Sequence, residues 1–384
     1  MMKKVLFVAS VDFHFTGFHI PVLQWFKHQG WEVHVAASGS ITIPYVDYKY
    51  TIPIQRSPFH HKNLAAYQEL KKILEHNQYD IIHCHTPMGG VITRLAARGT
   101  RKKGTKVLYT AHGFHFCKGA PLANWLIYYP IERLLAHQTD CLITINSEDY
   151  QLARHHKFSA KTITRLDGVG VDTEIFKPVP REEKAFLRFK SGYKQDDFLM
   201  FYAAEFNKNK NQRLLLEILA KVTTKSSNAK LLLAGDGPLL QQCRHYANQL
   251  GITEHVHFLG HRKDVHEILP MCDLILASSL REGLPVNIME GMACELPVVA
   301  TKNRGHQELV QEQHTGCLIE NTNIQQAALQ IENLINAPEK RRQFGQQARQ
   351  LILSKYSLTK IMQETSLLYR PYMGKEDHTK WMAQ

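Results

Sequence analysis

Residues 273–300 read DLILASSLREGLPVNIMEGMACELPVVA, and this stretch predicts a strand, a helix and a second strand in that order. A short apolar run fills 273–277, a helix is expected to begin near Pro285, and a second apolar run fills 297–300. Short buried strands that alternate with helices are typical of a parallel sheet with helices on both faces. The stretch therefore predicts an α/β fold.

The same alternation extends over both halves of the chain. We expect strands at 4–9, 31–37, 80–85, 105–111 and 141–146, and again at 198–203, 230–234, 255–258, 273–277 and 297–300. Paired glycines and prolines at 167–180 suit an interdomain hinge. The expected organisation is a domain at 1–170, a domain at 178–356, and a helical tail at 357–384 that packs back on the first domain.

Composition and charge limit the class of protein. Of the 384 residues, 44% are hydrophobic and 21% are charged, which excludes a mostly disordered chain and a polytopic membrane protein. No apolar run approaches the roughly 18–20 residues of a spanning helix. The formal net charge of +12 makes an anionic partner plausible: a nucleotide, a nucleic acid or a membrane surface. Seven scattered cysteines without a Cys-x-x-Cys pair fit a reducing cytoplasm.

Two glutamates stand eight positions apart in the loop and helix after the strand at 273–277. Glu282 lies in a Glu-Gly-Leu-Pro turn, and Glu290 falls inside the helix that follows. The amides of Gly283 and Leu284 would then be unpaired at a helix N-terminus, which is an anion site suited to a diphosphate. A carboxylate beside it suits hydrogen bonding to sugar hydroxyls. The alternative is that both glutamates are solvated.

The segment from Glu282 to Glu290, with the residues 293–300 after it, resembles the donor-site signature of the family 4 retaining glycosyltransferases. That resemblance implies the GT-B fold, with two Rossmann-like parallel-sheet domains that face each other across a cleft. It also implies that Glu282 contacts the transferred sugar, that Gly283 and Leu284 cradle the diphosphate, and that Glu290 contacts the ribose. Residues 304–310 resemble the family's next segment, Gly-x-x-Glu-Leu-Val.

Other segments of the second domain carry the same resemblance. It implies that Gly235, in the Gly-x-Gly turn at 235–237, begins the nucleotide half-domain, and that Arg262 borders the base. Lys210 stands where the family has its phosphate-binding lysine, which would neutralise charge on the leaving diphosphate. Glu205 occupies the position of the family's arginine, so either Lys208 or another cation replaces it, or one phosphate contact is lost.

In the first domain, the histidine of Thr110-Ala111-His112-Gly113 closes a strand and resembles the family's histidine beside the donor sugar. We therefore expect His112 to take part in catalysis with Glu282. The first loop, 12–19, lacks the Gly-x-Gly-x-x-Gly of a dinucleotide cofactor, and Gly17 resembles the glycine that lets this loop approach the substrates.

The sequence gives little sign of a metal. His83 and His85 alternate on one strand and point the same way, but no third ligand is indicated. No Asp-x-Asp metal motif is present either. We therefore expect no metal site, no cofactor and no requirement for a divalent cation.

Aromatic and basic side chains gather around 101–138. Trp125, Tyr128 and Tyr129 follow a cluster of Arg101 and nearby lysines. Such interleaving suits an anionic bilayer surface or a single-stranded nucleic acid, and the alternative is a core helix beside a solvated charge run. A polyprenyl-diphosphate-linked acceptor, which the resemblance implies, favours the membrane over nucleic acid.

The resemblance extends from Lys3 to about Tyr356 and is greatest to the exopolysaccharide and capsule branch. It implies a cytoplasmic enzyme, peripheral at the inner face of the plasma membrane. This enzyme would move a sugar from a nucleoside-diphosphate donor, UDP-sugar by preference, to a lipid-linked saccharide. Two alternatives remain: a sugar-nucleotide epimerase, and a nucleotide- or membrane-binding module without catalysis.

Overall fold

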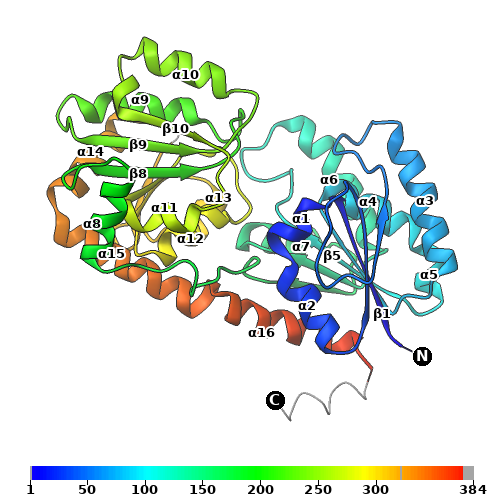
Figure 1. Ribbon diagram of the computed structural model, residues 1–384. Coiled ribbons are helices and arrows are strands. Elements are labelled where there is room, and N and C mark those ends of the chain that lie inside the picture. The colour runs from blue at the N-terminus through cyan, green and yellow to red at the C-terminus, as the bar shows by residue number, and fades with distance from the viewer. Residues whose placement is uncertain (1, 321, 375–384) are drawn as a thin grey trace. The chain divides into compact units, whose positions relative to one another are not determined.

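The computed structural model describes residues 2–320 and 322–374, which divide into two compact units. The first unit is Met1–Val169 together with the segment that begins at Ile361, and the second is Gly170–Lys360. Each unit is built on one sheet with helices on its faces (Figure 1).

The first unit contains a seven-stranded parallel sheet in the order β3-β2-β1-β4-β5-β6-β7. The strands are β1 Lys4–Val11, β2 Glu32–Ser38, β3 Tyr48–Thr51, β4 Ile81–His85, β5 Lys106–Ala111, β6 Cys141–Thr144 and β7 Thr162–Arg165. The inner strands are buried along most of their length because apolar side chains on both faces meet helices.

Seven helices connect these strands. They are α1 Phe13–Phe18, α2 Ile20–His28, α3 Lys62–His76, α4 Pro87–Ala96, α5 Arg98–Lys102, α6 Leu122–Ala136 and α7 Ser147–His155. Alternate residues of β1 serve two cores: Leu6 packs in the cluster that includes Leu70 of α3, and Phe7 packs in the cluster that includes Phe26 of α2. Because successive side chains of a strand point to opposite faces, β1 contributes apolar side chains to the cores on both faces of the sheet.

The second unit contains a six-stranded parallel sheet in the order β10-β9-β8-β11-β12-β13. The strands are β8 Phe198–Ala203, β9 Ala229–Ala234, β10 Val256–Gly260, β11 Leu274–Ala277, β12 Val298–Thr301 and β13 Gly316–Ile319. The parallel pairing puts the carboxyl ends of all six strands at one edge of the sheet. Ligands of open α/β sheets bind at that edge.

The helices of the second unit fall between and after these strands. They are α8 Arg181–Lys190, α9 Gln212–Thr223, α10 Leu240–Gln249, α11 Val265–Ile268, α12 Val286–Ala293, α13 Arg304–Leu309, α14 Ile324–Asn336 and α15 Pro338–Leu351, with the short turns η1 Thr253–His255, η2 Leu269–Met271 and η3 Ile352–Tyr356. Buried leucines such as Leu215 and Leu219 form the inner face of α9. This unit therefore has its own core.

The chain passes from one unit to the other at two neighbouring segments. The Val171 amide donates to the Tyr356 carbonyl at 2.9 Å, and the Leu358 amide donates to the Val171 carbonyl at 2.8 Å. Helix α16 (Leu358–Tyr369) and the turn η4 (Arg370–Tyr372) then follow, and Tyr369 is buried in the core of the first unit. The remainder of the predicted tail, residues 375–384, lies outside the described residues.

The structure contains every strand that the sequence predicted, with ends that differ by at most two residues. It also corrects two points. The expected loop at 12–19 contains α1, and three strands were not predicted, namely β3, β7 and β13. All three are four residues long and lie at sheet edges. The side chains of β3 and β7 are partly exposed, which weakens their apolar signal.

Candidate active site

The predicted donor-binding residues of the second unit gather at the carboxyl edge of its sheet. Lys210 follows β8, Gly235 follows β9, Arg262 follows β10, and the loop with Glu282, Gly283 and Leu284 follows β11. These four strands are neighbours in the sheet. Their loops therefore share one edge, although the residues are up to 74 positions apart from Lys210 to Leu284 in the chain.

The loops after β8 and β11 meet directly through an ion pair. The Lys210 Nζ lies 2.5 Å from the Glu282 Oε1, and both side chains are largely shielded from solvent, with 24% and 14% exposed. The Ser278 hydroxyl donates to the Lys210 carbonyl at 2.7 Å, and the Lys210 amide donates to the Asn207 Oδ1 at 3.0 Å. Backbone contacts thus fix the position from which the lysine reaches the glutamate.

The Glu282 loop is also held from the side of α13. The Arg304 Nε donates to the Glu282 carbonyl at 3.0 Å. Gly305 packs so closely that an added Cβ would lie 2.7 Å from the Glu282 Cβ, which is a clash. Glycine at 305 therefore allows α13 to support the loop.

The amides of Gly283 and Leu284 find no hydrogen-bond acceptor within residues 2–320 and 322–374. They come just before α12, whose N-cap is Pro285, a residue with no side-chain cap. Unpaired amides at the start of a helix carry a partial positive charge and favour an anion. Together with the Lys210 ammonium, they make this loop a candidate diphosphate site.

Glu290 lies in the second turn of α12, and burial raises the pKa of its carboxyl to about 7. The helix is tied to the end of β8, because the Asn287 Nδ2 donates to the Ala203 carbonyl at 2.8 Å. A carboxyl with this raised pKa can carry its proton near neutral pH, and so donate as well as accept hydrogen bonds.

Gly235 and Arg262 lie on the neighbouring loops. Gly235 has φ +137°, its amide donates to the Gly260 carbonyl at 2.7 Å, and an added Cβ would lie 2.0 Å from the Ala204 carbonyl oxygen. Only glycine fits there, because the loop after β9 lies against the loop after β8. The Arg262 guanidinium forms an ion pair with Asp264, two residues on. Within the part of the chain that the structure describes, it forms no hydrogen bond or ion pair with another predicted donor residue.

The structure also bears on the position where the family has an arginine. The Glu205 Oε2 accepts from the Asn207 Nδ2 at 2.9 Å, and the Glu205 carbonyl accepts from the Gln212 side chain at 3.0 Å. Lys208 lines a separate hollow between α9 and α10. Of the two lysines, Lys210 is the one that reaches Glu282.

Sequence reasoning missed His306 as part of this site. Burial lowers the pKa of its imidazole to about 4, and the opposing charges of Glu282 and Lys210 both act on it. The His306 Nδ1 donates to the Thr301 carbonyl at 2.5 Å, which fixes the ring behind the Glu282 loop. His306 lies within 304–310, the segment that resembles the family, and that resemblance is the signal that could have identified it.

In the first unit, His112 follows β5, where the sequence predicted it. Its Nε2 lies 3.2 Å from the Nδ1 of His85, the last residue of β4, and burial lowers the pKa of His112 to about 4. Gly17 lies within α1, and an added Cβ there would meet no atom within 4 Å, so local packing does not require glycine at this position.

His83 and His85, the pair that the sequence offered as metal ligands, make different contacts in the structure. His83 and His85 do point the same way, with ring centroids 4.2 Å apart. His83, however, uses both ring nitrogens, towards the Tyr369 hydroxyl and towards the Thr110 hydroxyl. His85 lies instead with His14, His19 and His112, so further candidate ligands exist that sequence spacing did not reveal.

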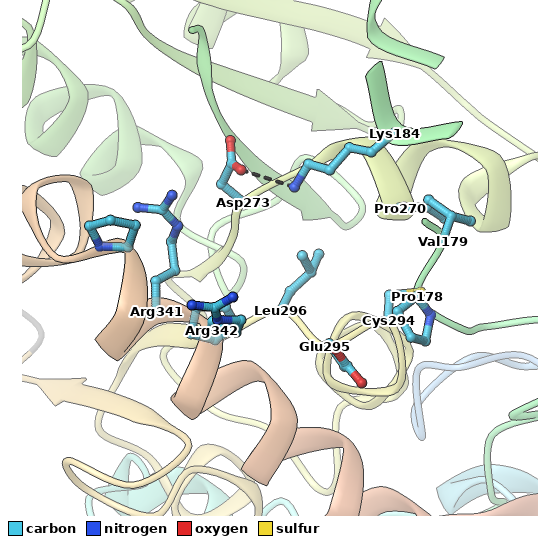
Figure 2. Close-up of a pocket in the computed structure, with 12 residues that line it drawn as sticks. Pro178, Val179, Lys184, Pro270, Asp273, Cys294, Glu295, Leu296, Arg341 and Arg342 are labelled. Atoms are coloured by element: carbon cyan, nitrogen blue, oxygen red, sulfur yellow. Dashed lines mark hydrogen bonds and ion pairs between the residues drawn. The ribbon is translucent and has the colours of Figure 1, made fainter. Parts of the chain in front are cut away.

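A hollow of about 230 Å³ lies at the opposite end of the second sheet (Figure 2). Figure 2 shows the Lys184 ammonium pointing at Asp273, the residue before β11, at 3.0 Å. Pro297, which precedes β12, also lines it. Because the amino ends of the strands form this hollow, it is not part of the loop cluster around Glu282.

Comparisons with known proteins agree with this geometry. Residues 183–351 match the family "Glycosyl transferases group 1", and residues 4–146 match "Glycosyl transferase 4-like". The chain is 48% identical to the "Putative glycosyltransferase EpsD" of Bacillus subtilis (strain 168), over 99% of this chain and all of the relative. The chain belongs to the family 4 glycosyltransferases. The enzyme class and the family resemblance predicted from the sequence are thereby confirmed.

Other relatives of this glycosyltransferase are more distant. It is 28% identical, over 67% of either chain, to the UDP-Gal:alpha-D-GlcNAc-diphosphoundecaprenol alpha-1,3-galactosyltransferase of Escherichia coli. The solved structure of Anabaena Alr3699/HepE with UDP-glucose superposes with a TM-score of 0.78 at 18% identity, covering 96% of this chain and 99% of that one. WaaG, a glycosyltransferase involved in lipopolysaccharide biosynthesis, gives 0.74 at 16% identity, covering 95% and 99%. These likenesses confirm the GT-B fold with two Rossmann-like domains.

None of the helices in the described part of this glycosyltransferase is long and apolar enough to cross a membrane.

Proposed function

We propose that this glycosyltransferase moves a sugar from a UDP-sugar to a lipid-linked saccharide, with retention of anomeric configuration, in the synthesis of exopolysaccharide or capsule. The observation that carries the proposal is the Lys210–Glu282 ion pair beside the unpaired amides of Gly283 and Leu284. These groups supply cationic and donor contacts for a diphosphate next to a carboxylate for a sugar.

The donor half of the proposal has two supports. Unpaired amides at the start of α12 and the nearby Lys210 ammonium are suited to the diphosphate of a nucleotide sugar. The solved structures of Anabaena Alr3699/HepE, which share the fold, contain UDP or UDP-glucose. We infer that Glu290 accepts hydrogen bonds from the ribose hydroxyls, and that the loops with Gly235 and Arg262 border the base.

In the proposed reaction, the bond between the anomeric carbon and the diphosphate oxygen breaks on the same face on which the acceptor hydroxyl attacks. The new bond joins the acceptor oxygen to the anomeric carbon, so the configuration is retained. The acceptor proton passes to the departing diphosphate. Lys210 and the amides of Gly283 and Leu284 stabilise the negative charge that builds there, and Glu282 orients sugar hydroxyls. We assign His112 a contact with the donor sugar, as the family resemblance implies.

This charge stabilisation comes from the protein itself, so we propose that transfer needs no divalent cation. An ammonium and two aligned amides are fixed before the substrate binds, which lowers the cost of reorganisation. Added Mg²⁺ or Mn²⁺ should therefore not raise the rate of transfer.

The acceptor half is supported by a relative and by a pocket. The Escherichia coli relative acts on a saccharide linked to diphosphoundecaprenol. In the first unit, a pocket of about 490 Å³ lies beside the ends of β1 and β4. Its wall is mainly apolar, with Phe13, Phe59 and Tyr128, and includes Arg56 and also Glu132, whose carboxylate is paired with Arg94. An apolar pocket with one guanidinium fits an acceptor that joins an apolar chain to an anionic diphosphate.

We further propose that α6 binds the inner membrane surface. Leu122 and Leu126 are one helical turn apart and are 73% and 68% exposed. Trp125, Tyr128 and Tyr129 pack partly into the core, so the exposed leucines form the apolar face of this helix and the aromatic residues do not. Exposed leucines on a basic protein suit shallow binding to an anionic bilayer.

Two experiments test the proposal. The first measures release of nucleoside diphosphate from UDP-, GDP- and ADP-sugars, with and without a bacterial lipid-linked acceptor fraction. Acceptor-dependent release from a UDP-sugar is expected. Conversion of the donor without an acceptor would favour the epimerase, and donor binding without any turnover would favour a binding module.

The second experiment measures flotation with vesicles that contain anionic lipid. Leu122→Asp with Leu126→Asp should lower the bound fraction. The control is Leu329→Asp, which removes a half-exposed leucine from α14 of the second unit. Equal flotation of the two variants would contradict membrane binding through α6.

A further inference from the structure

Four histidines converge at the carboxyl edge of the first sheet. His14 lies in α1, His19 lies between α1 and α2, His85 ends β4, and His112 follows β5. Each offers a ring nitrogen, and these four nitrogens all lie within 4.8 Å of one another. Two pairs are closer: the Nε2 atoms of His14 and His19 are 3.1 Å apart, and His85 Nδ1 is 3.2 Å from His112 Nε2.

We propose that His14, His19, His85 and His112 bind one Zn²⁺ ion. Four nitrogens at the Zn–N distance of about 2.0–2.1 Å around a tetrahedral ion are roughly 3.3–3.4 Å from one another. The Nε2 atoms of His14 and His19 already approach this spacing. The widest pair would have to close by about 1.4 Å, which small rotations of the imidazole rings supply.

The chemistry of the donor set selects the ion. Among the described residues, the group contains four imidazoles and no carboxylate or thiolate. Imidazole suits Zn²⁺ and its late transition-metal neighbours, whereas Mg²⁺ and Ca²⁺ require oxygen ligands. Zinc binds the neutral imidazole, in the tautomer that exposes a lone pair to the ion.

A buried nitrogen of His85 that lacks a hydrogen-bond partner is a second observation in favour of a bound ion. The Nε2 of His85 is buried, and within the described residues it has no hydrogen-bond partner. His85 itself is only 1% exposed. A buried nitrogen without a partner costs free energy whether it carries a proton or a lone pair. Ligation through the Nε2 of His85 would give this nitrogen a partner in the bound cation.

The ion would hold the end of β5 in place. Ligation through the Nε2 of His112 joins this residue to α1 and β4 and leaves its Nδ1 for another contact. Zn²⁺ would therefore act as a positioning group for His112 and need not take part in the transfer of the sugar. The inference stands apart from the proposed reaction, because its test reads metal content and not turnover.

The test uses the full chain without a polyhistidine tag, since such a tag binds zinc. The protein is stripped with chelator, loaded with Zn²⁺, separated from free metal, and analysed for zinc by mass spectrometry. We expect about one ion per chain, as in a four-ligand structural site. A chain that keeps no zinc after gel filtration would overturn the inference.

A second readout replaces zinc with Co²⁺, which absorbs visible light strongly in a tetrahedral nitrogen site and weakly in an octahedral one. The wild-type chain is expected to give the tetrahedral spectrum. An octahedral spectrum overturns the proposal, and this measurement needs no variant.

The variants are His14→Gln and His19→Gln, with His60→Gln as the control. His60 and His61 are a neighbouring pair with ring centroids 4.6 Å apart, outside the cluster. We expect His14→Gln and His19→Gln to weaken zinc binding at least about 10-fold and His60→Gln to leave it unchanged. Thermal melting of each variant checks that it folds. Equal zinc binding by folded His19→Gln and His60→Gln would count against the site.

Discussion

The Nζ of Lys210 and the Oε1 of Glu282 lie 2.5 Å apart, although 72 residues separate them in the chain. The pair joins the loop after β8 to the loop after β11. These two strands are neighbours in the sheet. In the substrate-free enzyme the carboxylate neutralises the ammonium. A bound diphosphate would then compete with Glu282 for Lys210 and release the carboxylate towards the sugar.

Replacing Lys210 should therefore slow transfer more than replacing its neighbour Lys208. Lys210→Met removes the cation beside the leaving diphosphate, and we expect kcat to fall about 10²–10³-fold. Lys208→Met removes an equal charge from the hollow between α9 and α10 and should change kcat less than about 3-fold. Steady-state kinetics with one donor measures both. Similar losses in the two variants would contradict the assignment of Lys210.

Glu282 is expected to act together with Lys210 and not independently. Glu282→Gln keeps the size of the side chain but loses its charge, and transfer should fall about 10²-fold or more. Because the two groups touch, the effects of Glu282→Gln and Lys210→Met should not add in the double variant. A double-mutant cycle on kcat/KM checks this, and simple addition of the two effects would show that the pair is not coupled.

Gly305 and Gly17 allow a matched comparison, because an added Cβ would clash at Gly305 and would meet no atom at Gly17. Gly305→Ala places a Cβ 2.7 Å from the Glu282 Cβ, so we expect the Glu282 loop to shift and activity to fall about 10-fold or more. Gly17→Ala meets no atom within 4 Å, so packing predicts no loss of stability. Measurements of activity and melting temperature on both variants test these expectations. A loss of activity in stable Gly17→Ala would instead support the role that the family resemblance implies for Gly17.

The raised pKa of Glu290 predicts a pH dependence of stability. The folded chain keeps the carboxyl proton up to about pH 7, whereas the unfolded chain loses it near its ordinary value of 4.5. Between these values the folded state binds more protons, so this group makes stability fall as pH rises from about 4.5 to about 7. Glu290→Gln, which cannot ionise, should remove that contribution.

Melting curves of wild type and Glu290→Gln across this pH range provide the measurement. The variant should gain in melting temperature relative to wild type as the pH rises. A constant difference between the two proteins from pH 5 to pH 8 would show that Glu290 is not protonated in the fold at neutral pH.

A buried ion pair supports the first unit. The Arg94 Nη2 lies 2.8 Å from the Glu132 Oε2, and the Arg94 side chain is fully buried. Arg94→Met leaves the Glu132 carboxylate without its cation, and we expect a loss of about 3–5 kcal/mol. The control Arg213→Met breaks the exposed pair of Arg213 with Glu217 and should lower the melting temperature far less. Thermal melting compares the two variants. Equal shifts in melting temperature would contradict the expected difference between a buried and an exposed ion pair.

Local pattern determined much of this protein. The apolar runs of β8 and β11 are continuous because both faces of an inner strand are buried, so sequence alone gave their positions. The edge strand β7 escaped detection since its sequence, Thr-Ile-Thr-Arg, is half exposed. The family motif likewise placed Glu282, Gly283 and Glu290 on one loop and one helix, because those residues are close in the chain.

Only the tertiary structure decided which distant residues meet. The order of strands in the sheet brings Lys210 to Glu282, and it brings His14 to His85 and His112, contacts that no spacing along the chain reveals. It also separated His83 from that cluster by giving both of its nitrogens other partners. Periodicity is a local property, but contacts between loops depend on which strands lie side by side.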